Sequence, residues 1–162
     1  MRRRSFTTIT IALALCVGAI PALAGSVTFT DPDDFEVAPD VQHTTKTTFL
    51  TREGHRRLRI SASGDVGPRY RLRVFIDSRR GDRADFVMVA TVAHLRLRSC
   101  AVRRIGGGAI DSLCDADPYR AWWGVRWRDL RPDKRIRWRI VALRGPGFHE
   151  VTDRAPDTGW YA

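Results

Sequence analysis

The sequence predicts an all-β protein, an antiparallel β-sandwich of about eight strands. Apolar and polar residues alternate with a period of two in most segments after residue 24, as in strands that bury one face. Turn signals rich in Gly, Pro and Asp separate these segments at regular intervals, which is typical of sandwiches and barrels. No helical repeat lies between them, so a parallel sheet with crossover helices is excluded. Jelly-roll-like connections are one arrangement that fits this pattern.

Residues 1–24 have the three parts of a secretory signal peptide. Residues 2–4 are arginines, residues 9–20 are apolar, and residues 22–24 form a cleavage site of the A-x-A type. We therefore expect a secreted protein, extracellular or associated with the cell wall. Residues 25–162 are expected to form a single domain that has no membrane span and is a monomer. An uncleaved N-terminal anchor is the alternative, and the adjacent arginines leave both Sec and twin-arginine export open.

The first half of the domain is expected to contain four strands. Residues 26–30 form a short β-rich run that suits an edge strand, and the Thr-rich residues 37–50 favour pleated structure. Residues 56–63 and 69–77 then alternate strictly. Their expected core faces consist of Leu58, Ile60, Ala62, Tyr70, Leu72, Val74 and Ile76.

Residues 84–92 are almost continuously apolar, as expected for a central strand that is covered on both faces. Cys100 and Cys114 are the two cysteines that remain after cleavage of the signal peptide, and an even number of cysteines in an exported chain predicts a disulfide. A metal site would need two further ligands, and no histidine lies near these cysteines. Reduced, buried thiols are the alternative. The three glycines at residues 106–108 suit the tip of the intervening loop.

Residues 121–145 are expected to form a hairpin, with two alternating strands joined by the polar turn at residues 129–134. Trp123, Trp127 and Trp138 fall on the core side of these strands, and the arginines fall on the other side. Burial of one Trp side chain contributes at most about 4–6 kcal/mol. Core packing therefore explains these residues better than stacking against a ligand.

The segments IDSRRGDRADFVMV, VRWRDL, IRWRIVAL and DRAPDTGW begin at Ile76, Val125, Ile136 and Asp153. Together they resemble small exported β-sandwich proteins of actinobacterial type, and the resemblance covers most of residues 25–162. It implies a β-sandwich fold and export, and it implies no activity. Asp77 and Asp85 match the acidic turn of those proteins, whereas residues 78–80 replace the alternating acids expected between them.

The chain carries a formal net charge of +10, and most of its basic residues are arginines. Guanidinium groups bind phosphates and carboxylates in a bidentate manner. Because many arginines fall on the outward side of the expected strands, we expect a non-catalytic domain that binds an anionic polymer or glycan through an Arg-rich sheet face. The candidate ligand-binding residues are Arg71, Arg73, Arg126, Arg128, Arg137, Arg139 and Trp122. A solvated face paired with aspartates is the alternative.

Nucleic acid is not expected as the partner. Proteins that bind single strands interleave aromatic and cationic side chains on one face. In the predicted strands, only Trp122 and Phe75 share the arginine side.

No cofactor and no metal site are expected. Asp77, Asp82 and Asp85 are the nearest approach to a calcium site, because hard cations bind several carboxylate oxygens. Arginines in the same turn would repel a cation and pair with these carboxylates. The acidic residues within 31–34 form another cluster, which is expected to be a solvated turn.

Two other functions remain open. One is a small hydrolase acting on wall or extracellular polymers, although the sequence has no HExxH or GxSxG motif, and Glu36, Glu53 and Glu150 are isolated. The other is an accessory or structural protein that docks a protein partner.

Overall fold

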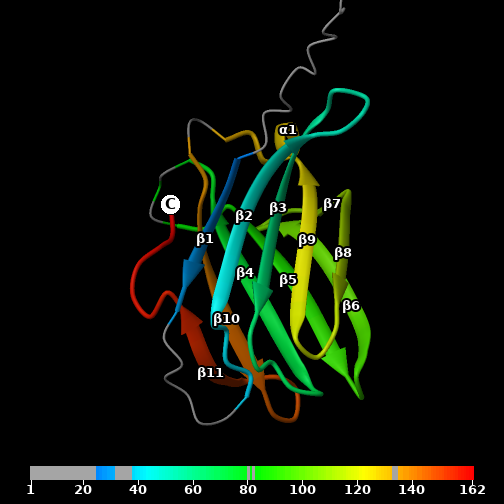
Figure 1. Cartoon of the computed structure of the whole chain (residues 1–162), viewed down its shortest axis with the longest axis vertical. Coiled ribbons are helices and arrows are strands. Elements are labelled where there is room, and N and C mark those ends of the chain that lie inside the picture. Colours follow the sequence, from blue (N-terminus) through cyan, green and yellow to red (C-terminus); the bar gives the residue numbers. More distant parts are fainter. Residues whose placement is uncertain (1–24, 32–37, 80, 82, 133–134) are drawn as a thin grey trace, which may run out of the picture.

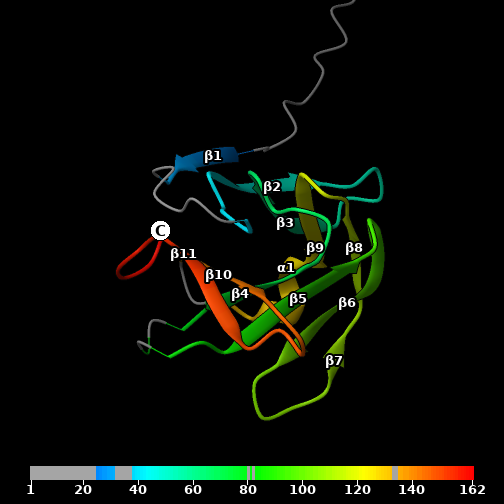
Figure 2. The same ribbon diagram turned by 90° about the horizontal axis from the view of Figure 1, so that it is seen from below.

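The structure is a computed structural model, and it describes residues 25–31, 38–79, 81, 83–132 and 135–162. Within these residues, eleven strands form two antiparallel sheets that pack face to face, and one short helix lies between β9 and β10 in the chain (Figure 1, Figure 2). The predicted all-β sandwich is confirmed. The described part of the chain contains no helix that is long and apolar enough to cross a membrane. The expected signal peptide lies outside the described residues.

The first sheet has five strands. In order across the sheet they are β1 (Gly25–Thr30), β2 (His43–Leu50), β3 (Arg56–Ser63), β9 (Arg120–Arg126) and β8 (Ser112–Ala116). The predicted edge strand is β1, and its hydroxyls pair with the Thr-rich β2. Thr28 Oγ1 lies 2.9 Å from Thr45 Oγ1, and Ser26 Oγ lies 3.2 Å from Thr47 Oγ1. Cross-strand hydroxyl pairs of this kind stabilise the outer face of a sheet.

The second sheet has six strands. In order they are β11 (Glu150–Ala155), β10 (Arg137–Arg144), β4 (Tyr70–Asp77), β5 (Phe86–Ala93), β6 (Arg96–Arg104) and β7 (Ala109–Ile110). The apolar β5 is an interior strand, as predicted, but it is not covered on both faces, because Val87 and Val89 on its outer face are only half-buried. The strands outnumber the expected eight because short strands flank residue 111 and because the C-terminal tail pairs with β10 as β11.

The side chains that the period-two pattern places inside are buried. Leu58 of β3 and Val74 of β4 are 0% exposed, and so are Trp123 of β9 and Trp138 of β10. Trp138 Nε1 donates a hydrogen bond to Thr44 Oγ1 of the facing sheet at 3.0 Å. The two tryptophans therefore hold the sandwich together from opposite sheets.

The prediction that residues 121–145 form a hairpin is wrong. The first of its strands, β9, pairs with β3 and β8, whereas β10 pairs with β4 and β11. The chain crosses from one sheet to the other through α1 (Trp127–Leu130) and Arg131, whose φ of 46° is left-handed. Trp127 lies half-buried in α1 and not on a strand. Alternation specifies which side chains are buried, but it does not specify which strands pair.

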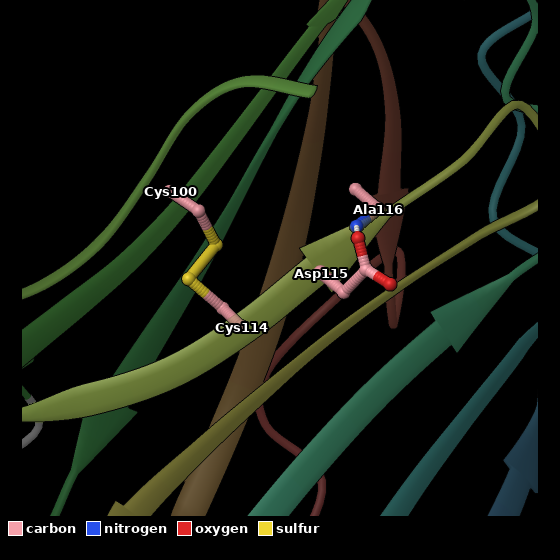
Figure 3. The surroundings of a disulfide bond; sticks show 4 residues. All are labelled: Cys100, Cys114, Asp115 and Ala116. Carbon is pink, nitrogen blue, oxygen red and sulfur yellow. Dashed lines mark hydrogen bonds between the residues drawn. A yellow bond between two sulfur atoms is a disulfide. The ribbon is translucent and has the colours of Figure 1, made fainter. Parts of the chain in front are cut away.

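Different links close the two open edges of the sandwich. At one edge, Cys100 of β6 and Cys114 of β8 form the predicted disulfide, with their Cα atoms 6.1 Å apart (Figure 3). The strands β1 and β11 lie at the opposite edge (Figure 2). There the Val41 N–H donates to Asp153 Oδ2 of β11 at 2.6 Å.

Candidate anion-binding site

A hollow of about 580 Å³ lies at one end of the sandwich, beside α1 and the β6–β7 hairpin. Its described lining includes four arginines, Arg104, Arg126, Arg128 and Arg131. Arg104 ends β6, Arg126 ends β9, Arg128 lies in α1, and Arg131 follows α1. The hollow therefore brings together cations from both sheets. Figure 1 shows α1 and β7 at the same end of the sandwich.

The cations in this hollow outnumber the carboxylates. Arg126 Nη2 lies 3.0 Å from Asp111 Oδ2, and Arg128 Nε lies 3.9 Å from Asp129 Oδ1. Arg104 and Arg131 are exposed and form no salt bridge within the described residues. An anion that enters the hollow therefore meets two guanidinium groups that have no carboxylate partner there.

A smaller hollow of about 190 Å³ adjoins the first, and its lining includes His55, Arg56 and Trp127. Arg126 and Arg128 line both hollows. The Arg56 guanidinium lies 3.9 Å from the centroid of the Trp127 ring, which holds it by a cation–π contact. We call this combined surface the basic end. Its cations are Arg56, Arg104, Arg126, Arg128 and Arg131.

The ligand-binding residues predicted from the sequence do not share one face. Four of them lie on the outer face of the six-stranded sheet, and the others lie in β9 and α1. The first group is Arg71, Arg73, Arg137 and Arg139, and the second is Trp122, Arg126 and Arg128. The expected Arg-rich face is divided in this way because β9 and β10 belong to different sheets.

On the six-stranded sheet, the protein itself engages the guanidinium groups of β10. Arg137 Nε donates to Asp77 Oδ2 at 3.0 Å, and Asp77 is fully buried. The Arg139 guanidinium lies 5.3 Å from the centroid of the Phe75 ring and 4.9 Å from that of Trp160. These two arginines are therefore less available to a ligand than the exposed arginines of the basic end.

The tail adds aromatic rings to this sheet face that the sequence pattern does not reveal. Trp160 contacts Arg139, and Phe148 lies with its centroid 4.5 Å from the Arg71 guanidinium. The expectation that only Trp122 and Phe75 share the arginine side is therefore wrong. Burial and the charge of Arg73 lower the pKa of Arg71.

Trp122 lies on the outer face of the five-stranded sheet and is half-buried. The Arg59 guanidinium covers it, 4.6 Å from its ring centroid, and also lies 5.8 Å from the centroid of Phe49. Trp122 does not line either hollow of the basic end. The Trp122 ring therefore contacts Arg59 of its own sheet and lies apart from the arginines of the basic end.

The acidic turn between β4 and β5 is held by its own hydrogen bonds. Asp77 Oδ1 accepts from the Arg79 N–H at 3.0 Å, and Asp85 Oδ2 accepts from the Ser78 N–H at 3.0 Å. Asp82 lies outside the described residues. The Asp77 and Asp85 carboxylates therefore accept backbone hydrogen bonds of the turn itself.

Sequence reasoning does not select Arg104 or Arg131. Arg104 stands at the end of an alternating strand and Arg131 in the turn of an expected hairpin, so neither position is distinctive. Only the crossover through α1 places them together.

Comparison of the chain with protein-family models, with curated proteins and with solved structures finds no match.

Proposed function

We propose that this protein is a secreted, non-catalytic module that binds an anionic polymer at the basic end. The observation that carries the proposal is the convergence of Arg104, Arg126, Arg128 and Arg131 on one hollow whose described lining has two aspartates. Such an excess of guanidinium groups attracts phosphate or carboxylate groups and holds them by charge-assisted hydrogen bonds.

The existing ion pairs of the hollow indicate how a carboxylate would be held. Asp111 already binds Arg126 at 3.0 Å, in a pair whose side chains are 70% and 37% exposed. An exposed pair of this kind contributes little to stability, so a ligand can replace the aspartate at small cost. Arg104 and Arg131 would bind additional groups of the same ligand.

A polymer fits the basic end better than a single small anion. The two hollows adjoin and share Arg126 and Arg128, and Arg56 extends the cationic surface into the second hollow. Anionic groups that repeat along a chain could occupy both hollows at once. Several weak contacts then combine into useful affinity.

The expected export of the protein limits the choice of polymer. A disulfide is compatible with an oxidising compartment, and residues 1–24 have the pattern of a signal peptide. Teichoic-type wall polymers and acidic polysaccharides carry phosphate or carboxylate groups in that environment. The ligand class is therefore an extracellular polymer with regularly spaced anionic groups.

Retention on a phosphocellulose resin in a salt gradient tests the proposal. The variant Arg104→Gln with Arg131→Gln should elute at clearly lower salt than the unmodified protein, with affinity weakened roughly tenfold or more. The control is Arg96→Gln with Arg98→Gln, which removes the same charge from exposed positions near the other end of β6. Circular dichroism verifies that both variants fold.

The control should elute close to the unmodified protein. Equal shifts for both double variants would mean that net charge alone drives retention, and they would overturn the proposal. Unchanged retention of Arg104→Gln with Arg131→Gln would overturn it as well.

A further inference from the structure

Three aspartates lie close together beside β1 and β11. These two strands lie at the same edge of the sandwich (Figure 2). Asp31 follows β1, Asp153 belongs to β11, and Asp157 follows β11. Each offers one carboxylate oxygen, and the three oxygens lie within 4.8 Å of one another. We call these residues the acidic cluster. It lies where the end of β1 in one sheet approaches β11 in the other.

Two of the three aspartates are buried. Asp31 is 6% exposed and Asp153 is 1% exposed, whereas Asp157 is exposed to solvent. Asp31 Oδ1 accepts a hydrogen bond from the Tyr161 hydroxyl at 2.9 Å. Asp40, another buried carboxylate, is close enough to act on the charge of Asp153.

Asp153 is the member whose bonding is incomplete. Its Oδ2 accepts the Val41 N–H at 2.6 Å, but its Oδ1 is buried and has no hydrogen-bond partner within the described residues. Burial, with the charges of Asp31 and Asp40, raises the pKa of Asp153 to about 6. A buried carboxylate oxygen without a partner is costly, and a bound cation would remove that cost.

We propose that the acidic cluster of Asp31, Asp153 and Asp157 binds a calcium ion. Hard cations take carboxylate oxygens, and Ca²⁺–O bonds of about 2.3–2.6 Å allow ligand oxygens to lie up to about 5 Å apart. Exposed Asp157 gives the ion a path of entry from solvent. Backbone carbonyls and water would complete the six to eight ligands that Ca²⁺ takes.

Calcium suits this site better than magnesium. Mg²⁺ demands a near-octahedral set of ligands at about 2.0–2.1 Å and retains most of its water, whereas Ca²⁺ accepts irregular sets of carboxylates. The acidic cluster comes from separate segments whose geometry is set by sheet packing. The ion would link the β1–β11 edge, just as Cys100–Cys114 links the opposite edge. This proposal does not depend on the function proposed for the basic end.

Thermal unfolding of the purified protein tests the site. After treatment with EDTA and removal of the chelator, CaCl₂ is added to 10 mM (roughly ten or more times the Kd of an extracellular-type site). The Tm should rise by about 3–10 °C relative to NaCl of the same ionic strength, and MgCl₂ should give less than half of that rise. Isothermal titration calorimetry should give one Ca²⁺ per chain.

Two variants locate the ion. Asp157→Asn changes an exposed side chain and should abolish most of the calcium-dependent rise in Tm. Asp153→Asn keeps the acceptor for the Val41 N–H but removes a buried charge. Without calcium its Tm should equal or exceed that of the unmodified protein, and calcium should have no effect. Asp115→Asn, on the exposed surface of β8, is the control and should respond to calcium normally.

The proposal is overturned if calcium raises the Tm no more than ionic strength does. It is also overturned if Asp157→Asn retains the full calcium response. Either result can be obtained even if Asp153→Asn fails to fold.

Discussion

Arg137 Nε donates a hydrogen bond to Asp77 Oδ2 at 3.0 Å, and Arg137 Nη2 donates to the same oxygen. The pair joins β10 to β4, where these residues are directly opposite in the ladder. The Asp77 side chain is 0% exposed and that of Arg137 is 26% exposed. Because a buried carboxylate is costly unless it is paired, the Arg137 guanidinium supports the fold through Asp77.

Arg137→Ala should therefore lower the free energy of unfolding by about 3 kcal/mol, at the low end for a buried pair because the guanidinium is partly exposed. Arg139 lies two residues further along β10. Arg139→Ala loses mainly cation–π contacts and should lower the free energy of unfolding by about 1 kcal/mol. Urea unfolding of the two variants measures the difference. Equal costs would contradict the structural role of the Arg137–Asp77 pair.

The two buried tryptophans should differ in their tolerance of phenylalanine. Trp138 Nε1 donates to Thr44 Oγ1 at 3.0 Å, whereas Trp123 Nε1 is buried and has no hydrogen-bond partner within the described residues. Both substitutions leave a similar cavity, but only Trp138→Phe removes a hydrogen bond. Trp138→Phe should therefore cost about 1 kcal/mol more than Trp123→Phe in urea unfolding. The opposite order would show that Thr44 does not hold Trp138.

Removal of the disulfide should weaken the edge formed by β6 and β8. Cys100 and Cys114 are 14 residues apart in the sequence, and a loop of that size is worth about 3 kcal/mol in the chain-entropy model. The variant Cys100→Ala with Cys114→Ala should lose that amount of unfolding free energy. Dithiothreitol should destabilise the unmodified protein to a similar extent and leave the variant unchanged. A reductant effect on the variant would contradict this assignment.

Tyr70 should make the protein sensitive to alkaline pH. Its hydroxyl donates to the Asp117 carbonyl at 2.6 Å, and burial, with the charges of Asp117 and Asp115, raises its pKa above the ordinary 10.0. The folded protein therefore keeps this proton at a pH where the unfolded chain releases it. The resulting stability is fully present below about pH 10 and is lost as the pH rises further.

In Tyr70→Phe the decline of Tm above about pH 10 should be shallower than in the unmodified protein. Differential scanning calorimetry at several values of pH measures both slopes. Identical slopes would show that Tyr70 does not contribute to the alkaline loss of stability.

The buried faces of the strands could be predicted from the sequence because side-chain direction in a strand is a local property. The alternation in β3, β4 and β10 was sufficient to place Leu58, Val74 and Trp138 inside. The pairing of β9 and β10 could not be predicted in this way, because a four-residue helix gives no helical repeat and a crossing connection resembles a turn.

The candidate sites were only partly predictable for the same reason. Arg126 and Arg128 were among the predicted ligand-binding residues, but Arg104 joins them through the packing of two sheets. The acidic cluster combines Asp31 with Asp153, which lie near opposite ends of the domain sequence. Contacts between distant segments are set by topology, which a local pattern does not contain.

The most direct test asks which arginines a polymer covers. Labelling with phenylglyoxal, followed by peptide mass spectrometry, measures the reactivity of each arginine with and without saturating polyphosphate at low salt. We predict that the polymer slows labelling several-fold at Arg104, Arg128 and Arg131 and leaves Arg73 and Arg96 unchanged. The account would be contradicted if the polymer protected Arg73 and Arg139 and left Arg104 and Arg131 unchanged. That result would mean that the polymer binds the outer face of the six-stranded sheet and not the basic end.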